Sequence, residues 1–227
     1  MKKTLIILAA AISLATGAHA QKYRVKIETE YGTIKGFLYK NTPQNTANMV
    51  KVAKEHGYDS TLFHRVIPEF MIQGGDPDSK YAKPGQALGG GGLKYTVPAE
   101  INDEDYHKRG AIAVARDNNP SKAGSATQFY IVVGKKFTDA DLDGIAARTG
   151  RKYTAEQRNV YRTIGGTPHL DGNYTVFGEV IDGLAIVDSI AKQPRNEMNR
   201  PDKDIRMTMT GEWIKKKKIT KKYGYKF

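Results

Sequence analysis

The stretch FHRVIPEFMIQGGD, residues 63–76, gathers an arginine, two phenylalanines, a methionine and a glutamine around one proline and a glycine pair. Alternation over residues 62–67 predicts a short strand in which Phe63 and Arg65 share one face. Pro68 has no amide proton to donate, so this strand must bend or end there. The stretch therefore predicts two short strands that meet at a proline.

The second strand of this pair begins at Phe70 and places Met71 and Gln73 on one face. Phe70 and Met71 would then form a shallow apolar patch, with the Arg65 cation and the Gln73 amide at its edge. An alternative stays open on these residues alone. Arginines beside aromatic rings are often surface side chains, and Phe-Met pairs are often part of a core.

As a whole, the string resembles the signature of the cyclophilin family of peptidyl-prolyl cis-trans isomerases. The resemblance implies that Phe70, Met71 and Gln73 hold a substrate proline and that Arg65 is the catalytic residue. His64 is assigned to the substrate-binding set as a residue that orients its neighbours through hydrogen bonds. A structural histidine is the alternative, because this reaction moves no proton.

Residues 110–133 predict two apolar strands around a polar loop, and the resemblance continues here. Cyclophilins carry an alanine and an asparagine at the end of the first strand, and a Gln-Phe-Phe string in the second. This chain has Ala115, then Arg116 in place of the asparagine, and Gln128 followed by Phe and Tyr130. The resemblance assigns these four to substrate binding, and the Tyr130 hydroxyl needs either a partner or solvent.

A second long match to the family is TPHLDGNYTVFGEV, residues 167–180. In many cyclophilins a tryptophan precedes the leucine, and a histidine stands where this chain has Tyr174. The resemblance therefore implies that His169, Leu170 and Tyr174 form the rim of the substrate site. Because bacterial members often replace both positions, we expect activity to be kept and cyclosporin binding to be weak.

The implied reaction is rotation about the peptide bond before a proline, which requires no metal, nucleophile or cofactor. Its barrier is about 18–20 kcal/mol in the free chain. Twisting the amide localises the nitrogen lone pair, and Arg65 can donate a hydrogen bond to it only in that twisted state. The family roles give the grip on the proline ring to apolar residues, and the flanking carbonyls to Gln73 and the backbone around Arg116.

The first residues resemble a secretory signal peptide, with a basic start at Lys2 and Lys3, an apolar stretch and a small-residue cleavage site ending at Ala20. A membrane anchor is the alternative, although the apolar run falls short of the roughly 20 residues that a span needs. We predict cleavage after Ala20 and a periplasmic or secreted protein. The 227 residues contain no cysteine and carry a formal net charge of +12, which attracts anionic partners.

The resemblance implies a mainly β fold, namely a closed antiparallel eight-stranded β-barrel with two capping helices. We assign residues 21–214 to this cyclophilin-like domain, with a helical hairpin inserted at about 137–166. Its helices are expected at about 139–149 and 155–164, and its role is left open between a surface insertion and a partner site. The lysine-rich tail, 215–227, is expected to be frayed and solvated, with anionic lipid or nucleic acid binding as the alternative.

The predicted function is isomerisation of Xaa-Pro bonds during the folding of exported proteins. The expected partners are proline-containing unfolded or partly folded polypeptides, and we expect a monomer, no nucleic acid and no stable membrane insertion. Two other functions stay open. One is a binding module that holds proline-bearing segments without turnover; the other is an anion-binding protein that works through its lysine tail and depends steeply on salt.

Overall fold

The computed structural model describes residues 21–225. The predicted signal peptide, residues 1–20, lies outside these residues. Among the described residues, none of the helices has the length and apolar character needed to cross a membrane.

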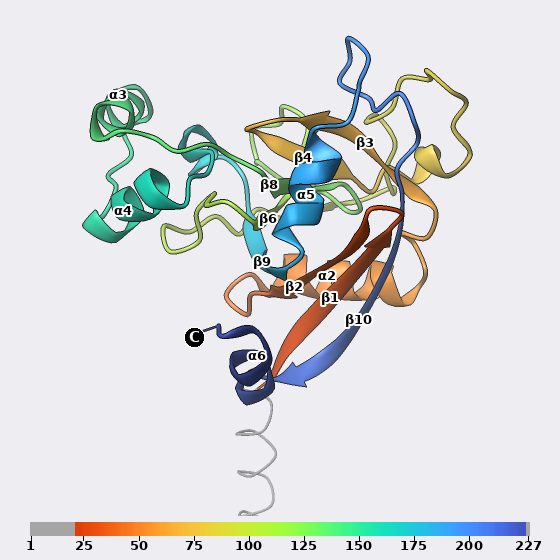
Figure 1. The fold of residues 1–227 in the computed structure, drawn as a ribbon, viewed down its shortest axis with the longest axis horizontal. Helices are drawn as coiled ribbons and strands as arrows, with labels where there is room; N and C mark the ends of the chain where they lie inside the picture. Colours follow the sequence, from red (N-terminus) through yellow and green to blue (C-terminus); the bar gives the residue numbers. More distant parts are fainter. Residues whose placement is uncertain (1–20, 226–227) are drawn as a thin grey trace, which may run out of the picture.

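A single antiparallel sheet dominates the molecule (Figure 1). Its strands follow the order β1-β10-β3-β4-β8-β6-β9-β2, and β1 also pairs with β2, so the order returns to its start. The link between β10 and β3 is short, with two residue pairs. The predicted mainly β, antiparallel architecture is confirmed. The strands are β1 (Gln21–Thr29), β2 (Gly32–Leu38), β3 (Thr61–Ile67), β4 (Met71–Gly74), β6 (Ala111–Val114), β8 (Phe129–Val132), β9 (Val176–Asp182) and β10 (Arg206–Lys215), with β5 (Thr96–Val97) and β7 (Gly124–Ser125) paired separately.

Two helices, α2 (Pro43–Lys54) and α5 (Leu184–Ala191), pack against the main core of the sheet (Figure 1). Their apolar faces enter this core with Met49 and Val52 from α2 and with Val187 and Ile190 from α5. Alternation decides the strand faces as predicted. In β8, Phe129 and Ile131 face this core, whereas Tyr130 and Val132 belong to a second cluster on the other face.

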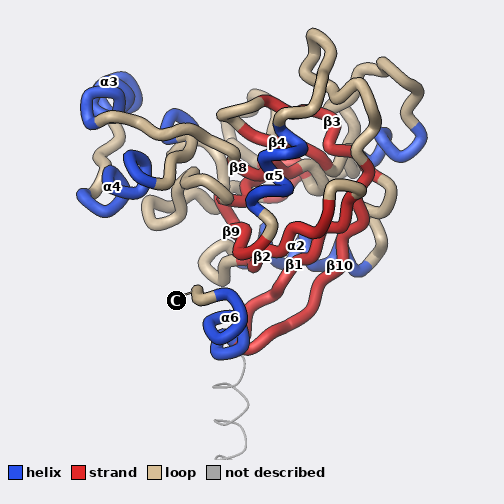
Figure 2. Tube along the Cα trace, viewed as in Figure 1, coloured by secondary structure: helices blue, strands red, loops and turns tan. Residues whose placement is uncertain are grey.

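The helices α3 (Asp139–Thr149) and α4 (Ala155–Thr163) form the predicted helical hairpin, which extends away from the sheet (Figures 1 and 2). Thr138 and Thr154 each begin a helix with a capping box, in which the N-cap and N3 side chains satisfy each other's backbone amides. Gly150 ends α3 in the left-handed conformation with φ of 72°. Local signals therefore predicted both helices correctly.

The C-terminal tail is not the frayed segment that its seven lysines suggested. Residues Lys216–Tyr223 form helix α6, and Ile219 is fully buried beside Phe37 and Ile214. Tyr225 packs edge-on against Phe37, with the ring centroids 4.8 Å apart. Helix α6 packs because its few apolar side chains lie on one stripe, whereas Lys217, Lys218, Lys221 and Lys222 are exposed.

Ile219→Ala is expected to lower the free energy of unfolding by about 2 kcal/mol, because it leaves a cavity beneath α6. Urea unfolding followed by the fluorescence of Trp213, the single tryptophan of the chain, measures this. Thr220→Ala is the control, since that side chain is exposed in the same helix. Equal midpoints for Ile219→Ala and wild type would show that α6 does not pack in solution.

Candidate active site

A bulge in β3 decides which way Arg65 points. The pairing of β3 with β4 aligns Phe63 with Gly74 and Arg65 with Gln73, so His64 is an extra residue. Phe63 consequently faces the core and Arg65 the opposite surface. The prediction that Phe63 and Arg65 share a face is wrong, because the extra residue breaks the alternation.

Nine of the twelve predicted site residues line one pocket of about 110 Å³. They come from the adjacent strands β3, β4 and β8, from the short 3-10 helix η2 (Pro168–Leu170), and from the segments beside these elements and after β6. The strand order therefore brings together parts of the chain that are far apart in sequence. The nine are Arg65, Phe70, Met71, Gln73, Ala115, Arg116, Tyr130, Leu170 and Tyr174.

Arg65 is a half-buried cation at the edge of this apolar pocket. Its guanidinium carbon lies 5.9 Å from the centroid of the Phe70 ring, and Nη1 donates a long hydrogen bond of 3.4 Å to Oε1 of Gln73. Burial lowers the pKa of Arg65 from its ordinary value, but arginine stays charged at any working pH. The bond to Gln73 is the one side-chain hydrogen bond that Arg65 makes among the described residues. Most of the guanidinium N–H groups can therefore donate to a ligand.

Gln73 is held in place from behind by Gln128. The Gln73 amide donates to Oε1 of Gln128 at 3.1 Å, and the Gln128 amide donates to the carbonyls of Gly89 at 3.0 Å and Gly91 at 2.7 Å. Buried Asp76 anchors this glycine loop by accepting the Gly89 amide at 2.6 Å. Gln128 lines a neighbouring cavity of about 250 Å³ and supports the Arg65 pocket indirectly, through Gln73.

The far rim carries three of the departures from the family pattern, His169, Arg116 and Tyr174. His169 is exposed and stacks on Phe70 with centroids 5.7 Å apart, so it covers the pocket edge without lining it. The Arg116 guanidinium carbon lies 4.7 Å from the Tyr174 ring centroid, and Nε donates to the Asn173 carbonyl at 3.0 Å. A second cation therefore stands at this rim.

His64 lies outside the Arg65 pocket. As the bulge residue it is 3% exposed, and it faces a neighbouring cavity that shares Arg65 and Gln73 with that pocket and is lined also by Leu88, Met198 and Arg200. Neither ring nitrogen makes a well-formed hydrogen bond among the described residues. The structure therefore favours the structural alternative for His64 over the predicted orienting role through hydrogen bonds.

Buried His64 is expected to make stability depend on pH. Burial lowers its pKa to about 4, against the weaker opposing effects of Asp76 and the Leu62 backbone. Between pH 4 and 6.5 the unfolded chain binds the extra proton, so stability is full above pH 6.5 and falls as pH drops toward 4. The free energy of unfolding should be about 2 kcal/mol lower at pH 5 than at pH 7.5 on account of this group.

Urea unfolding of wild type and His64→Leu across pH 4.5–7.5 isolates this contribution, because the other titrating groups are common to both proteins. We expect a steeper loss of stability toward acid in the wild type. Parallel curves for the two proteins would mean that His64 is protonated in the folded state as readily as in the unfolded chain.

Sequence reasoning missed a buried polar chain behind the pocket. The Tyr130 hydroxyl lies 2.8 Å from Nε2 of His107, and Nδ1 of His107 lies 2.7 Å from Oδ1 of Asp171. The Tyr161 hydroxyl donates to the other Asp171 oxygen at 2.5 Å. The signal was a tyrosine hydroxyl in need of a partner, but nothing in the sequence identified His107, 23 residues away, as that partner.

Together these residues can grip a proline ring and respond to a twisted amide. The apolar walls exclude water, while Arg65 provides a charged donor at one edge and Gln73 an amide for a flanking peptide group. Within residues 21–225 no three His, Cys, Asp or Glu side chains come together as a metal site. The arrangement suits recognition and rotation of an Xaa-Pro bond.

Comparisons with known proteins agree with this geometry. A family model described as cyclophilin type peptidyl-prolyl cis-trans isomerase/CLD matches residues 24–212. A protein of Staphylococcus aureus strain COL, named as a peptidyl-prolyl cis-trans isomerase, is 33% identical over 183 residues, which cover 80% of this chain and 87% of that protein. A Streptococcus pyogenes serotype M6 protein, named as a bifunctional phosphatase/peptidyl-prolyl cis-trans isomerase, is 36% identical over 186 residues. That match covers 80% of this chain but 37% of the longer relative.

Among solved structures, a cyclophilin type peptidyl-prolyl cis-trans isomerase of Cryptosporidium parvum matches with a TM-score of 0.61. The match covers 84% of this chain and 98% of that structure at 24% sequence identity, so it supports the fold. The cyclophilin-like architecture predicted from the two sequence motifs is thereby confirmed. With the family model spanning most of its length, this chain belongs to the cyclophilin-type peptidyl-prolyl cis-trans isomerase family.

Proposed function

We propose that this protein catalyses cis-trans isomerisation of Xaa-Pro bonds in exported polypeptides and so assists their folding. The observation that carries the proposal is the position of Arg65, a charged donor with one long hydrogen bond at the edge of an apolar pocket. A cation that makes one long hydrogen bond beside apolar walls contributes little to the stability of the fold. It is suited to a ligand that needs a hydrogen bond inside an apolar environment.

In the proposed mechanism the proline ring enters between Phe70, Met71, Tyr130 and Leu170. Water is excluded there, and water favours the planar, more polar amide. As the bond twists, the proline nitrogen becomes an acceptor and Arg65 donates to it. A preorganised donor of this kind is worth about 3–4 kcal/mol in other enzymes, so the pocket walls must supply the rest.

The proposed substrates are proline-containing segments of unfolded or partly folded chains. Support comes from a structure of the Cryptosporidium parvum relative determined in the presence of the dipeptide Ala-Pro. Export to the periplasm or the medium rests on the signal-like residues 1–20. We further propose a monomer of bacterial origin that binds cyclosporin weakly, since His169 stands where many relatives carry tryptophan.

The domain plan is also a proposal: residues 21–214 as the isomerase domain with the hairpin as its insertion. For the sheet, we propose a closed eight-stranded barrel. The β1–β2 pairing supports closure, and the weakest joint is the two-pair contact between β10 and β3.

Exchange between the cis and trans forms of a short Ala-Pro peptide, followed by NMR exchange spectroscopy, tests the activity. Residues 21–227 should accelerate the exchange at catalytic concentrations. A folded protein that binds the peptide but leaves the exchange rate unchanged would favour the binding module. Export is tested separately, by expressing the full chain in a Gram-negative host and asking whether the periplasmic protein begins at Gln21.

A further inference from the structure

The Tyr130 ring forms part of the pocket, and its hydroxyl lies against His107, which is not a pocket residue. Oδ1 of Asp171 accepts from the His107 backbone amide at 2.8 Å and lies 2.7 Å from Nδ1 of the same residue. A carboxylate oxygen can only accept, so Nδ1 carries the proton. In the neutral imidazole Nε2 is then an acceptor, and the Tyr130 hydroxyl donates to it.

All four residues of this hydrogen-bond chain are buried. Tyr130 is 4% exposed, His107 1%, and Tyr161 and the Asp171 side chain are fully buried. Buried hydrogen bonds in series have few alternative partners, so each one fixes the orientation of the next. The position of the Tyr130 ring is therefore tied to groups that do not touch the pocket.

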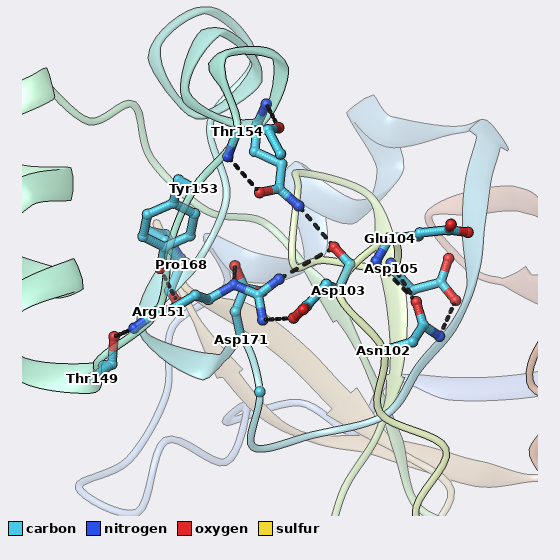
Figure 3. Close-up of polar contacts among 12 residues, drawn as sticks. Asn102, Asp103, Glu104, Asp105, Thr149, Arg151, Tyr153, Thr154, Pro168 and Asp171 are labelled. Carbon is cyan, nitrogen blue, oxygen red and sulfur yellow. Dashed lines mark hydrogen bonds and ion pairs between the residues drawn. The ribbon is translucent and has the colours of Figure 1, made fainter.

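The hydrogen-bond chain that starts at Tyr130 ends in the helical hairpin. Tyr161 lies in α4, and Arg151 lies in the link between α3 and α4. Figure 3 shows Arg151 between two acidic residues, where Nη1 donates to Asp103 at 3.0 Å and Nε lies 3.7 Å from Asp171. Asp171 thus receives a donor and a cation from the hairpin.

The hairpin also holds the short helix that supplies Leu170 to the pocket. The Tyr153 hydroxyl, from the α3–α4 link, donates to the Pro168 carbonyl at 2.9 Å (Figure 3). Asp171 follows Leu170 directly. The hairpin consequently contacts the supports of two pocket walls, Tyr130 and Leu170, although its own helices lie outside the pocket.

We propose that the α3–α4 hairpin is the positioning element of the proline pocket, acting on the Tyr130 ring through Tyr161, Asp171 and His107. These three are positioning residues, since none of them lines the pocket. The inference deepens the isomerase function and rests on it. It gives the hairpin a role that its sequence left open, and it explains how a tyrosine serves where many relatives carry phenylalanine.

A double-mutant cycle tests the proposal. Tyr161→Phe removes one hydroxyl from the hairpin end and keeps the buried ring, and Tyr130→Phe removes the hydroxyl that receives the effect. We expect Tyr161→Phe to lower kcat/KM for the Ala-Pro peptide by about threefold to tenfold, as for residues coupled in one network. In the Tyr130→Phe background the same change should cost less than about twofold, because a phenylalanine ring cannot be held through His107.

The matched control is Tyr106→Phe. Its ring packs on Tyr161 with centroids 5.6 Å apart, and its hydroxyl makes no hydrogen bond with the described residues. This variant should leave kcat/KM unchanged. Equal losses from Tyr161→Phe in both backgrounds, or no loss in a folded single variant, would overturn the proposal and leave the hairpin a structural element.

A readout independent of turnover separates this proposal from the isomerase function. Long-range proton–nitrogen NMR of the four histidines in residues 21–227, with His107→Gln to assign the signal, should show His107 protonated on Nδ1 near neutral pH. Protonation on Nε2 alone would overturn the hydrogen-bond chain even if catalysis is normal. If His107 carries the Nδ1 proton but the protein does not accelerate exchange, the hydrogen-bond chain stands. The isomerase function then fails, and with it the catalytic part of the proposal.

Discussion

Arg65→Ala is expected to lower kcat/KM for an Ala-Pro peptide by about 100-fold to 1000-fold, which is the usual cost of removing one preorganised transition-state donor. The planar amide nitrogen accepts no hydrogen bond, so the loss should fall mainly on kcat rather than on peptide affinity. NMR exchange rates over a range of peptide concentrations separate the two quantities. Arg116, the other cation among the described pocket residues, donates to the carbonyls of Asn173 and Asp117 and lies over the Tyr174 ring, so we do not expect it to replace Arg65.

Arg65→Lys is the matched variant, since it keeps the charge but replaces a rigid fork of donors by a flexible point charge. We expect its activity to lie between those of wild type and Arg65→Ala. Stability should change little in either variant, because the one hydrogen bond of Arg65 is long and half-exposed. If Arg65→Ala retains activity within tenfold of wild type, Arg65 is not the transition-state donor and the mechanism fails.

Asp171→Ala is expected to lower the free energy of unfolding by about 3–5 kcal/mol, the largest stability effect that we predict. The side chain is fully buried and accepts from His107 and Tyr161, while Arg151 lies 3.7 Å away. Alanine would leave buried donors without an acceptor and a largely buried guanidinium without this carboxylate. Such groups lose their hydration on folding and have no hydrogen-bond acceptor in the folded protein to replace it.

Urea unfolding followed by Trp213 fluorescence measures this loss, with Asp182→Ala as the control. Asp182 makes an ion pair with Lys35 at 2.7 Å, but its side chain is 46% exposed, so that variant should lose less than about 1 kcal/mol. Similar small losses for both variants would mean that water reaches Asp171 and satisfies the same donors.

Local signals predicted much of the fold correctly. Capping threonines and a terminal glycine marked α3 and α4, because the first and last turns of a helix must satisfy their own backbone groups nearby. Strict alternation predicted the two faces of β8, because successive side chains of a strand point to opposite faces of the sheet. In these segments the pattern that decides the structure lies within a few residues.

Prediction failed where the conformation of a segment depends on contacts with residues that are distant in sequence. The strand through Phe63 and Arg65 looked regular, but pairing with β4 inserts His64 as a bulge and turns Arg65 to the other surface. The lysine-rich tail looked solvated, but Ile219 finds an apolar site formed by β2 and β10. Neither the register between strands nor a docking site far along the chain is written in the segment itself.

The sequence by itself determined the family, the mainly β plan and most members of the Arg65 pocket, because two long motifs carry them as a set. Only the tertiary structure decided how the pocket is supported. His107 is 64 residues from Asp171, Tyr161 lies ten residues before it in another element, and each alone is an ordinary polar residue. Their roles arise from burial, because a polar group without water must use whichever partner the fold provides, and the folded chain alone decides which partner that is.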